Sequence, residues 1–394
     1  MADPREADLL ASVLAAPDDD APRLVYADWL LERGDPRGEF IALQCRAAAL
    51  PDGAARWALE SNTKALLERH DEDWFGAIRR ICPDVALEIR RGFPEGISCT
   101  GDVRSLIECA PELFARAPIG RLWLHAESEW YEPSNEFVSP HFRVGSLSGC
   151  ALDRLSALPE LVRIHDLGVV SSDDGAVTLF DSPYLTGVRS LTLCGCASAE
   201  LVKAALRSLA LDSLALDSSP ATDEAVAVLV DAEMPTLIRL SLRCEPISPY
   251  PNRPGPTTRG VAALADRRGL PRLREVMVWD HPLNYGQVRS WLGDATAERF
   301  AAAPRTAELS ALGLRCPVGI QGVRALTESP NTDTLTVDLE LDWLSDECLL
   351  LLAYASRPRA IRFWGGSKTH VEVGELRAMF NARATFPHYD EPLP

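Results

Sequence analysis

The run Val188-Arg-Ser-Leu-Thr-Leu193 decides the fold of this chain, because its pattern returns twice at almost constant spacing. Leu211-Asp-Ser-Leu-Ala-Leu216 and Leu237-Ile-Arg-Leu-Ser-Leu242 repeat the order apolar-x-x-apolar-x-apolar. The alternation that ends each run is typical of a β-strand with one buried face. A segment with helical periodicity follows each run. A strand, a turn and a helix that recur in this way predict a solenoid.

Further strands of the same kind extend the array on both sides of these three runs. The first apolar positions of the predicted strands are Ile119, Leu161, Val188, Leu211, Leu237, Leu273, Leu309 and, approximately, Thr332 and Pro358. The spacing between the three central runs falls within the roughly 20–29 residues of a leucine-rich repeat. The Leu161 unit is irregular, because it would put Asp166 at an apolar position.

Segments with helical periodicity lie between the predicted strands, as an α/β repeat requires. They span Ser198 to Leu209, Thr222 to Val230, Thr258 to Ala265, Gly319 to Leu326 and Ser345 to Ala355. Several of them open on Ser or Thr followed by an acidic residue, a pattern that favours a capped helix N-terminus. The longer connections at residues 127–145 and 246–256 are predicted loops.

The N-terminal part of the chain predicts helices and no strands. Helical patterns start at Arg5 and run from Arg23 to Arg33, from Glu39 to Ala49 and from about Arg56 to His70. The pattern changes near Val85, where residues 86–90 and 96–99 predict a hairpin and residues 102–115 predict a helix. A last short helix is predicted at residues 375–380.

The run from Asp18 to Ile41, DDDAPRLVYADWLLERGDPRGEFI, closely resembles the short helical repeat-companion domain of bacterial proteins. Arg90-Arg-Gly-Phe-Pro-Glu-Gly96 resembles the segment by which that family passes into its repeats. Residues 260–264 followed by 270–276 resemble the helix–strand phrase of ribonuclease-inhibitor-like leucine-rich repeats, although few strands here end in that family's Asn or Cys. The resemblance implies a helical domain that precedes a repeat array, and it implies no catalytic residue.

These observations predict an α/β leucine-rich-repeat solenoid, a curved parallel sheet with outer helices, preceded by a small α-helical domain. We divide the chain into a helical repeat-companion domain at 1–84, a capping hairpin and helix at 85–118, the irregular solenoid at 119–380, and an acidic, Pro-containing tail at 381–394. The end units need covering, because one strand–helix unit cannot bury its own apolar face.

Composition argues against two classes of partner. The net charge of -17 disfavours nucleic-acid binding, which depends on clustered Lys and Arg. The longest apolar run, Cys348 to Ala355, is far shorter than the roughly 20 residues that span a bilayer. The N-terminus has no secretory pattern. We therefore expect a cytoplasmic protein that binds no membrane and whose ten cysteines are free thiols.

The motifs that could carry chemistry are weak. Cys194 and Cys196 form a close pair, but a metal site needs two further ligands that are not near them in sequence. His165 and Asp166 precede Ser171, yet the chain has no Gly-x-Ser-x-Gly elbow and no phosphate-binding glycine loop. We predict no catalytic residue, no metal site and no cofactor.

The predicted solenoid supplies a better candidate site. In each strand the fifth and seventh positions of the repeat point to the concave face of the sheet. Trp and Arg are the residues most enriched at interface hot spots. The candidates are the Trp, Arg, His and Asp residues at these concave positions, namely Trp123, His125, Asp217, Arg243, Trp279, Arg315, Asp338, Arg362 and Trp364.

The sequence therefore predicts a non-enzymatic module, monomeric on its own, that recognises a partner protein through this concave face. The acidic surface favours a partner with a basic patch and salt-sensitive association. One alternative is a substrate or inhibitor of a processing enzyme, such as a co-encoded protease, engaged through the loops at 127–145 and 246–256. A second alternative is an enzyme with an unrecognised site, which would need a concave pocket with convergent ionisable groups.

Overall fold

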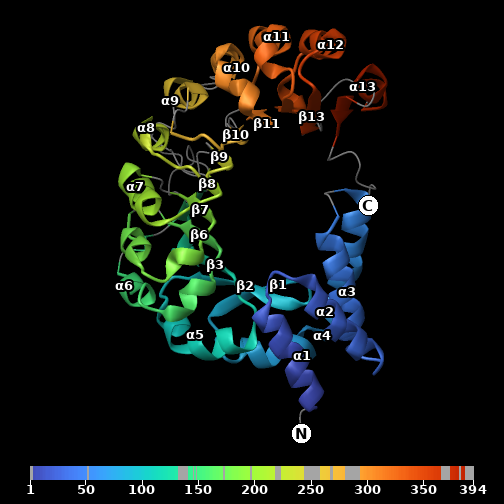
Figure 1. Cartoon of the computed structure of the whole chain (residues 1–394), viewed down its shortest axis with the longest axis vertical. Coiled ribbons are helices and arrows are strands. Elements are labelled where there is room, and N and C mark those ends of the chain that lie inside the picture. The colour runs from blue at the N-terminus through green and yellow to red at the C-terminus, as the bar shows by residue number, and fades with distance from the viewer. Residues whose placement is uncertain are drawn as a thin grey trace.

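The computed structural model describes residues 3–50, 53–131, 141–144, 146–147, 149–171, 174–195, 198–217, 223–243, 258–266, 269–279, 293–364, 373–380 and 383–386. These residues form an α/β fold with a 12-stranded, mostly parallel open sheet and a helical region at the N-terminus. Figure 1 shows the strands along the inner side of a curved array and the helices along its outer side. The loop predicted at 246–256 lies outside the described residues.

The helical region contains α1 (Pro4–Ala15), α2 (Asp20–Leu31), α3 (Pro36–Ala48) and α4 (Ala54–Arg79). The first three helices begin alike, because Asp3, Asp19 and Asp35 each accept a hydrogen bond from a backbone N–H of the first turn. All four helices were predicted, but α4 does not end near His70. It continues because Trp74 and Phe75 pack against Phe40, with ring centroids 5.0 and 6.4 Å away.

The large sheet follows the order of the chain from one edge to the other. Its strands are β1 (Val85–Arg90), β2 (Phe93–Thr100), β3 (Arg121–His125), β6 (Asp166–Val170), β7 (Ser190–Cys194), β8 (Ser213–Asp217), β9 (Arg239–Arg243), β10 (Glu275–Trp279), β11 (Ala311–Arg315), β12 (Thr336–Glu340), β13 (Ala360–Trp364) and β14 (Ala384–Thr385). The predicted hairpin is confirmed, since β1 and β2 pair antiparallel, and every later pair in this sheet is parallel.

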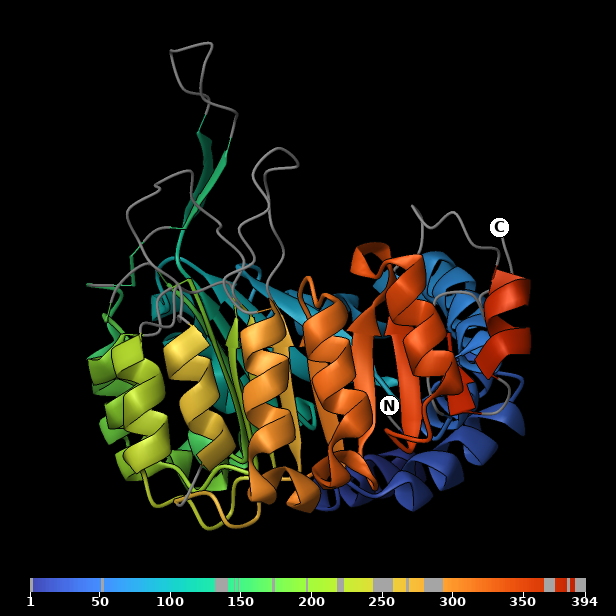
Figure 2. The same ribbon diagram turned by 90° about the horizontal axis from the view of Figure 1, so that it is seen from above.

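The helices that follow the strands lie on the outer side of the array, and in Figure 2 those between residues 258 and 354 stand side by side with strands behind them. They are α5 (Arg104–Arg116), α6 (Leu152–Leu155), α7 (Ala199–Ser208), α8 (Asp223–Asp231), α9 (Thr258–Ala263), α10 (Gly293–Ala302), α11 (Ile320–Glu328), α12 (Asp346–Tyr354) and α13 (Val373–Phe380). Ser198 and Ser345 cap α7 and α12 as predicted. Helix α10 was not predicted, although Ala297, Phe300 and Ala301 are buried at helical spacing on it.

Strict alternation along the strands builds one core between the sheet and the outer helices. The second and fourth residues of β7, Leu191 and Leu193, are fully buried, and they lie beside Leu214 and Leu216 of β8. Each such leucine contributes about 1.5–3 kcal/mol when it leaves water. Because each unit packs its apolar side chains against those of the next unit, the buried residues from Cys82 to Phe386 form one continuous core.

The strand register differs from the predicted one in two units. The unit predicted at Leu161 begins its strand at Asp166, because Leu161 is buried within a short 3-10 helix at Pro159–Arg163 that precedes the strand. Asp166 consequently lies on the inner face and not at a core position. In β12 the structural equivalents of Met277 and Trp279 are Asp338 and Glu340, two residues later than predicted.

Two further expectations were wrong. Residues 127–145 were predicted as an aperiodic loop, but they contain β4 (Ser128–Tyr131) and β5 (His141–Val144), paired antiparallel. The ten cysteines were expected to be free, yet Cys82 and Cys109 form a disulfide with their Cα atoms 5.9 Å apart. This bond joins the segment between α4 and β1 to α5. None of the helices among the described residues combines the length and apolarity needed to cross a membrane.

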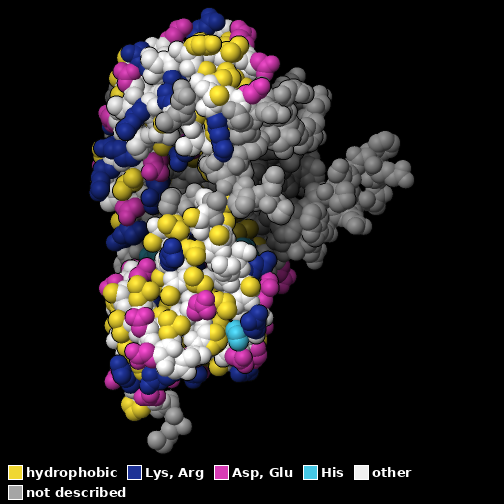
Figure 3. All heavy atoms as spheres, turned by 90° about the vertical axis from the view of Figure 1, so that its right-hand side faces the viewer, with side chains coloured by type: hydrophobic (Ala, Val, Ile, Leu, Met, Phe, Trp, Pro, Cys, Tyr) yellow, Lys and Arg dark blue, Asp and Glu magenta, His cyan; other side chains and the backbone are white. Residues whose placement is uncertain are grey.

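The ends of the curved array approach each other across an opening, with α13 on one side and α3 on the other (Figure 1). From the side of this opening, acidic and basic side chains are interspersed, and hydrophobic ones gather over the helical region (Figure 3). On α2 the exposed apolar side chains include Leu24, Val25 and Leu31.

Candidate functional site

The candidate site is the inner face of the sheet, formed by the first, third and fifth residues of each strand. All nine residues predicted for this face occupy such positions, because the buried hydrophobic residues of the five-residue strands β3 and β6–β13 are the second and fourth. The structure describes only the backbone positions of Asp217 and Arg243, at the ends of β8 and β9. The other seven side chains fall into two groups on opposite parts of the sheet.

Arg315 is the centre of the larger group. Its guanidinium carbon lies 3.8 Å from the ring centroid of Trp279 and 3.6 Å from that of Trp364. Two indoles this close would overlap if both lay on one face of the guanidinium, so they stack on opposite faces. The three side chains come from β10, β11 and β13 and cross the strand between them. Each stacking contact contributes about 0.5–2 kcal/mol, depending on burial.

An ion pair lies beside this stack. The Asp338 carboxylate of β12 accepts a hydrogen bond from Nε of Arg362 on β13 at 2.6 Å. The Asp338 side chain is 1% exposed and that of Arg362 is 40% exposed, so the pair is buried on its acidic side alone. Burial raises the pKa of the Asp338 carboxyl, and the charge and hydrogen bond of Arg362 oppose that rise. Arg362 therefore keeps a buried carboxylate in place.

Glu340 completes this group and was missed by the sequence interpretation. It ends β12, between Arg315 and Trp364 in the register of the sheet. Burial raises the pKa of its carboxyl, and the positive charge of Arg315 opposes the change. The signal was present in the sequence, since Thr336-Val-Asp-Leu-Glu340 alternates, but the count started two residues too early. We name the set Trp279, Arg315, Asp338, Glu340, Arg362 and Trp364 the aromatic–arginine cluster.

Trp123 and His125 of β3 form the smaller group, which we name the Trp123 pair. Their rings stack with centroids 5.9 Å apart, and burial lowers the pKa of the imidazole, which favours its neutral form. The Trp123 ring lies over the neighbouring strand at Gly168, where an added Cβ would overlap with it. Met277 lies over Gly313 in the same way. Glycine thus lets large side chains lie flat on the inner face.

Small side chains separate the two groups. The third residues of β6, β7, β8 and β9 are Gly168, Thr192, Ala215 and Ser241. Five strand-to-strand steps lead from β3 to β10, which at about 4.8 Å each gives about 24 Å along the sheet. The third positions between the two groups therefore carry small side chains, with aromatic side chains on both sides of them.

The residues considered for catalysis are not assembled into a catalytic site. His165 and Ser171 flank β6 at its two ends, about 20 Å apart at the rise of a strand. Asp166 is instead engaged by the Arg121 side chain, with Nε donating at 2.8 Å. Within the described part of the chain, no group of three His, Cys, Asp or Glu residues could hold a metal ion.

Two shallow hollows lie away from the inner face, at the edge where the strands begin. The first is lined by Val230, Asp231, Asp266 and Arg305. Its neighbour shares Val230 and Asp231. In the first hollow, Arg305 and Asp266 are already in ion pairs, with Glu308 and Arg299 respectively. The charges of these two side chains are thus already paired within the chain.

A scan against protein-family models and a search of curated proteins both found no match to this chain.

Proposed function

We propose that the protein is a leucine-rich-repeat solenoid of the ribonuclease-inhibitor-like type, preceded by a helical domain of the repeat-companion type, and that it acts as a non-enzymatic protein-binding module. The curved array of parallel strands with outer helices supports the fold assignment. The observation that carries the function is the stack of Arg315 between Trp279 and Trp364 on the inner face.

The stack supports recognition because it is rigid before a partner arrives. Trp and Arg dominate interface hot spots, but an unrestrained arginine loses about 0.5–1.5 kcal/mol of side-chain freedom on binding. Two indoles already restrict Arg315, and Arg362 with Asp338 holds the adjacent strands. A partner segment that reaches this cluster therefore meets fixed aromatic surface at a low ordering cost.

The partner that we propose is a cytoplasmic protein with a basic patch. The net charge of -17 steers such a partner by long-range attraction, which added salt weakens. We propose the concave face as the contact surface, because its two aromatic groups, with small third-position side chains between them, offer anchors at separate points of one face.

Photocrosslinking from the two sides of the sheet tests this function. A photoreactive amino acid replaces Ala215, on the inner face, or Lys203, exposed on outer helix α7. In native lysate we expect one defined adduct from the inner position and none from the outer. The double variant Trp279→Ala/Arg315→Ala should lose the adduct at least about tenfold, since two anchors at an interface centre contribute more than about 1.4 kcal/mol together.

The matched control is Leu350→Ala/Tyr354→Ala on the outer surface of α12, where both side chains are exposed. This variant removes apolar area from the other side of the same array and should retain the adduct. Equal adducts from the inner and outer positions would contradict the proposal. So would an adduct that survives in the folded Trp279→Ala/Arg315→Ala variant.

A further inference from the structure

The turn between β1 and β2 is held by the helical region through several hydrogen bonds and packing contacts. Arg91 and Gly92 form this turn with left-handed backbones, at φ 46° and 83°. An added Cβ at Gly92 would overlap with Ile41 of α3, and the Gly92 N–H donates to Oε1 of Gln44 at 2.7 Å. The helical region thus contacts the backbone of the turn at Gly92, where glycine alone fits both the conformation and the space.

The next residue completes the core of the helical region. Phe93 is 3% exposed and belongs to the same hydrophobic cluster as Tyr26, Trp29 and Ile41, which come from α2 and α3. The Tyr26 and Phe93 rings lie 6.0 Å apart. Phe93 therefore fills a position that the helices do not fill from their own sequence.

Two arginines from different parts of the chain converge on the carboxylate of Glu95. Arg23 of α2 donates to Oε1 at 2.6 Å, and Arg91 donates to both carboxylate oxygens at 2.9 and 3.0 Å. The side chain of Arg23 is 0% exposed and that of Glu95 is 9% exposed. Such a buried pair is stable only when each partner stays in place, so it fixes one geometry between the helices and the strand.

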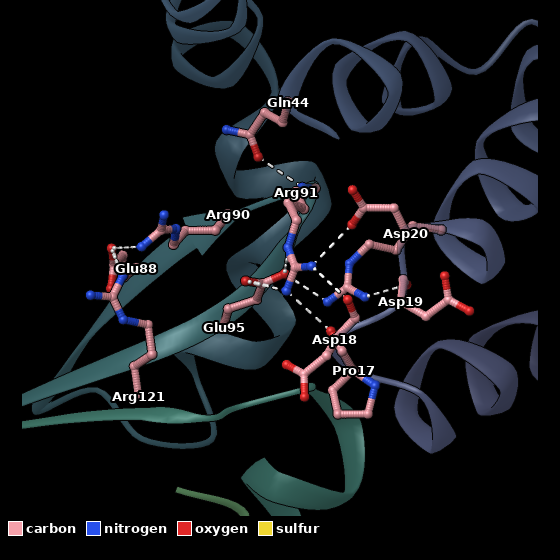
Figure 4. A network of polar contacts seen from close by, with 12 residues as sticks. Pro17, Asp18, Asp19, Asp20, Gln44, Glu88, Arg90, Arg91, Glu95 and Arg121 are labelled. Atoms are coloured by element: carbon pink, nitrogen blue, oxygen red, sulfur yellow. Dashed lines mark hydrogen bonds and ion pairs between the residues drawn. The ribbon is translucent and has the colours of Figure 1, made fainter. Parts of the chain in front are cut away.

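Arg91 extends the network to the segment that enters α2. Its guanidinium donates to Oδ1 of Asp20 at 3.0 Å, and to the carbonyl oxygens of Pro17 at 3.1 Å and Asp18 at 3.3 Å. Figure 4 shows this side chain reaching from the turn toward Pro17, Asp18 and Asp20, with Glu95 on its other side. One arginine thus joins the turn, the strand and the start of a helix.

We propose that the helical region is a turn-binding module, whose ligand in this chain is the segment from Arg91 to Glu95, and that this recognition locks the region to the first edge of the sheet. Each contacting residue of this segment has its own partner in the helical region. Arg91 donates to Asp20 and two carbonyls, and Gly92 packs against Ile41. Phe93 lies in the aromatic core, and Glu95 accepts from Arg23. The inference does not rest on the proposed function.

A distance measurement in the full chain tests the lock. Spin-labelled unnatural amino acids replace Arg46 of α3 and Lys203 of α7, which are both exposed, so the native cysteines remain untouched. We expect a single narrow distance distribution in the otherwise native chain. Glu95→Gln and Gly92→Ala should each broaden it and add longer distances. Hydrogen exchange should be at least about tenfold faster in α1–α3, with no change in β6–β12.

The control for backbone strain is Gly34→Ala. Gly34 has a left-handed backbone at φ 73° like Gly92, but an added Cβ there meets no atom within 4 Å. It should leave the distance distribution narrow. A narrow distribution in both Glu95→Gln and Gly92→Ala would overturn the proposal, as would equal broadening in Gly34→Ala. Exchange that rises equally in α1–α3 and β6–β12 would also overturn it, because the contacts would then serve general stability alone.

Discussion

Arginine, aromatic rings and carboxylates meet in two regions of this molecule, at the β1–β2 turn and in the aromatic–arginine cluster, with opposite exposure. At the turn, Arg23 is fully buried against Glu95 and Phe93 is enclosed by helices. In the cluster, Arg315 and both of its tryptophans remain partly exposed on the inner face. The same residue types therefore join two parts of the chain where water is excluded, and form an accessible surface where it is not.

The largest effect that this comparison predicts is the loss of the buried pair. Glu95→Ala should lower the free energy of unfolding by about 3–5 kcal/mol, because it leaves the buried charge of Arg23 without its carboxylate. Urea denaturation measures the change. The matched control is Glu112→Ala, which breaks a pair with Arg116 that is more than half exposed on both sides and should cost at most about 1 kcal/mol. Similar costs for the two variants would erase the contrast.

The second prediction concerns the half-buried pair of the inner face. Arg362→Ala should cost about 1–3 kcal/mol at pH 7, since Asp338 is buried and loses its charged partner. The pKa of the Asp338 carboxyl, already raised by burial, should rise further in this variant. A carboxyl whose folded pKa exceeds its unfolded value of about 3.9 favours the folded state below that value. The unfolding free energy of Arg362→Ala should therefore fall, relative to wild type, as pH rises from 4 to 7.

The check on this sign is the double variant Asp338→Asn/Arg362→Ala. It has no carboxyl at position 338, so the extra pH dependence should vanish while the loss of packing around the pair remains. Denaturation at a series of pH values distinguishes the two variants. A single variant whose unfolding free energy instead rises with pH would show that Asp338 remains well paired without Arg362.

A smaller effect is expected at the stack itself. Arg315→Met keeps much of the apolar stem and removes the charge, so stability should fall by about 1–2 kcal/mol, since each of the two cation–π contacts on this partly exposed face contributes about 0.5–1 kcal/mol. The free energy of binding the crosslinked partner should weaken by more than the free energy of unfolding does, because the stack is proposed to form the interface. A variant that loses stability but keeps full binding would place this cluster with the buried turn as a structural element.

The smallest expected effect is a titration at the Trp123 pair. Burial lowers the pKa of His125, so its imidazole should be neutral at pH 7 and charge only below its ordinary value of about 6.5. The fluorescence of the stacked Trp123 should report this step, and His125→Gln should abolish it. Since the unfolded chain binds the proton more readily, this group contributes a slight stability above about pH 6.5 that is lost as pH falls.

Local patterns determined how far the sequence predicted the molecule. Strands in units of the type Val188-Arg-Ser-Leu-Thr-Leu193 lie where the alternation of apolar and polar residues predicted them. A one-residue slip would expose every leucine, so this pattern fixes the register. The units at Leu161 and Thr332 were misplaced, because these two residues are buried within short 3-10 helices, Pro159–Arg163 and Pro330–Thr332, and the strands begin later, at Asp166 and Thr336. Periodicity does not reveal such turns.

Long-range contacts limited the prediction of the sites. Counting along each strand found Trp279, Arg315 and Trp364 as members of one face, but not that their rings and guanidinium stack. The motif from Arg90 to Gly96 was recognised as an exit from the helical region, yet its contact with Arg23 joins residues 72 positions apart. Hydrogen bonds of this kind follow from the way the helices pack, which no local pattern contains.

The strand order has a consequence for assembly. Unpaired N–H and C=O groups at a sheet edge can recruit strands from other molecules and start aggregation. One edge of this sheet is β1, the outer strand of an antiparallel hairpin, where Glu88 and Arg90 add charge. The other edge is β14, where the described part of the chain offers the two residues Ala384 and Thr385 as a template. Both edges are thus poor templates for strands from other molecules, which disfavours growth of the sheet into fibres.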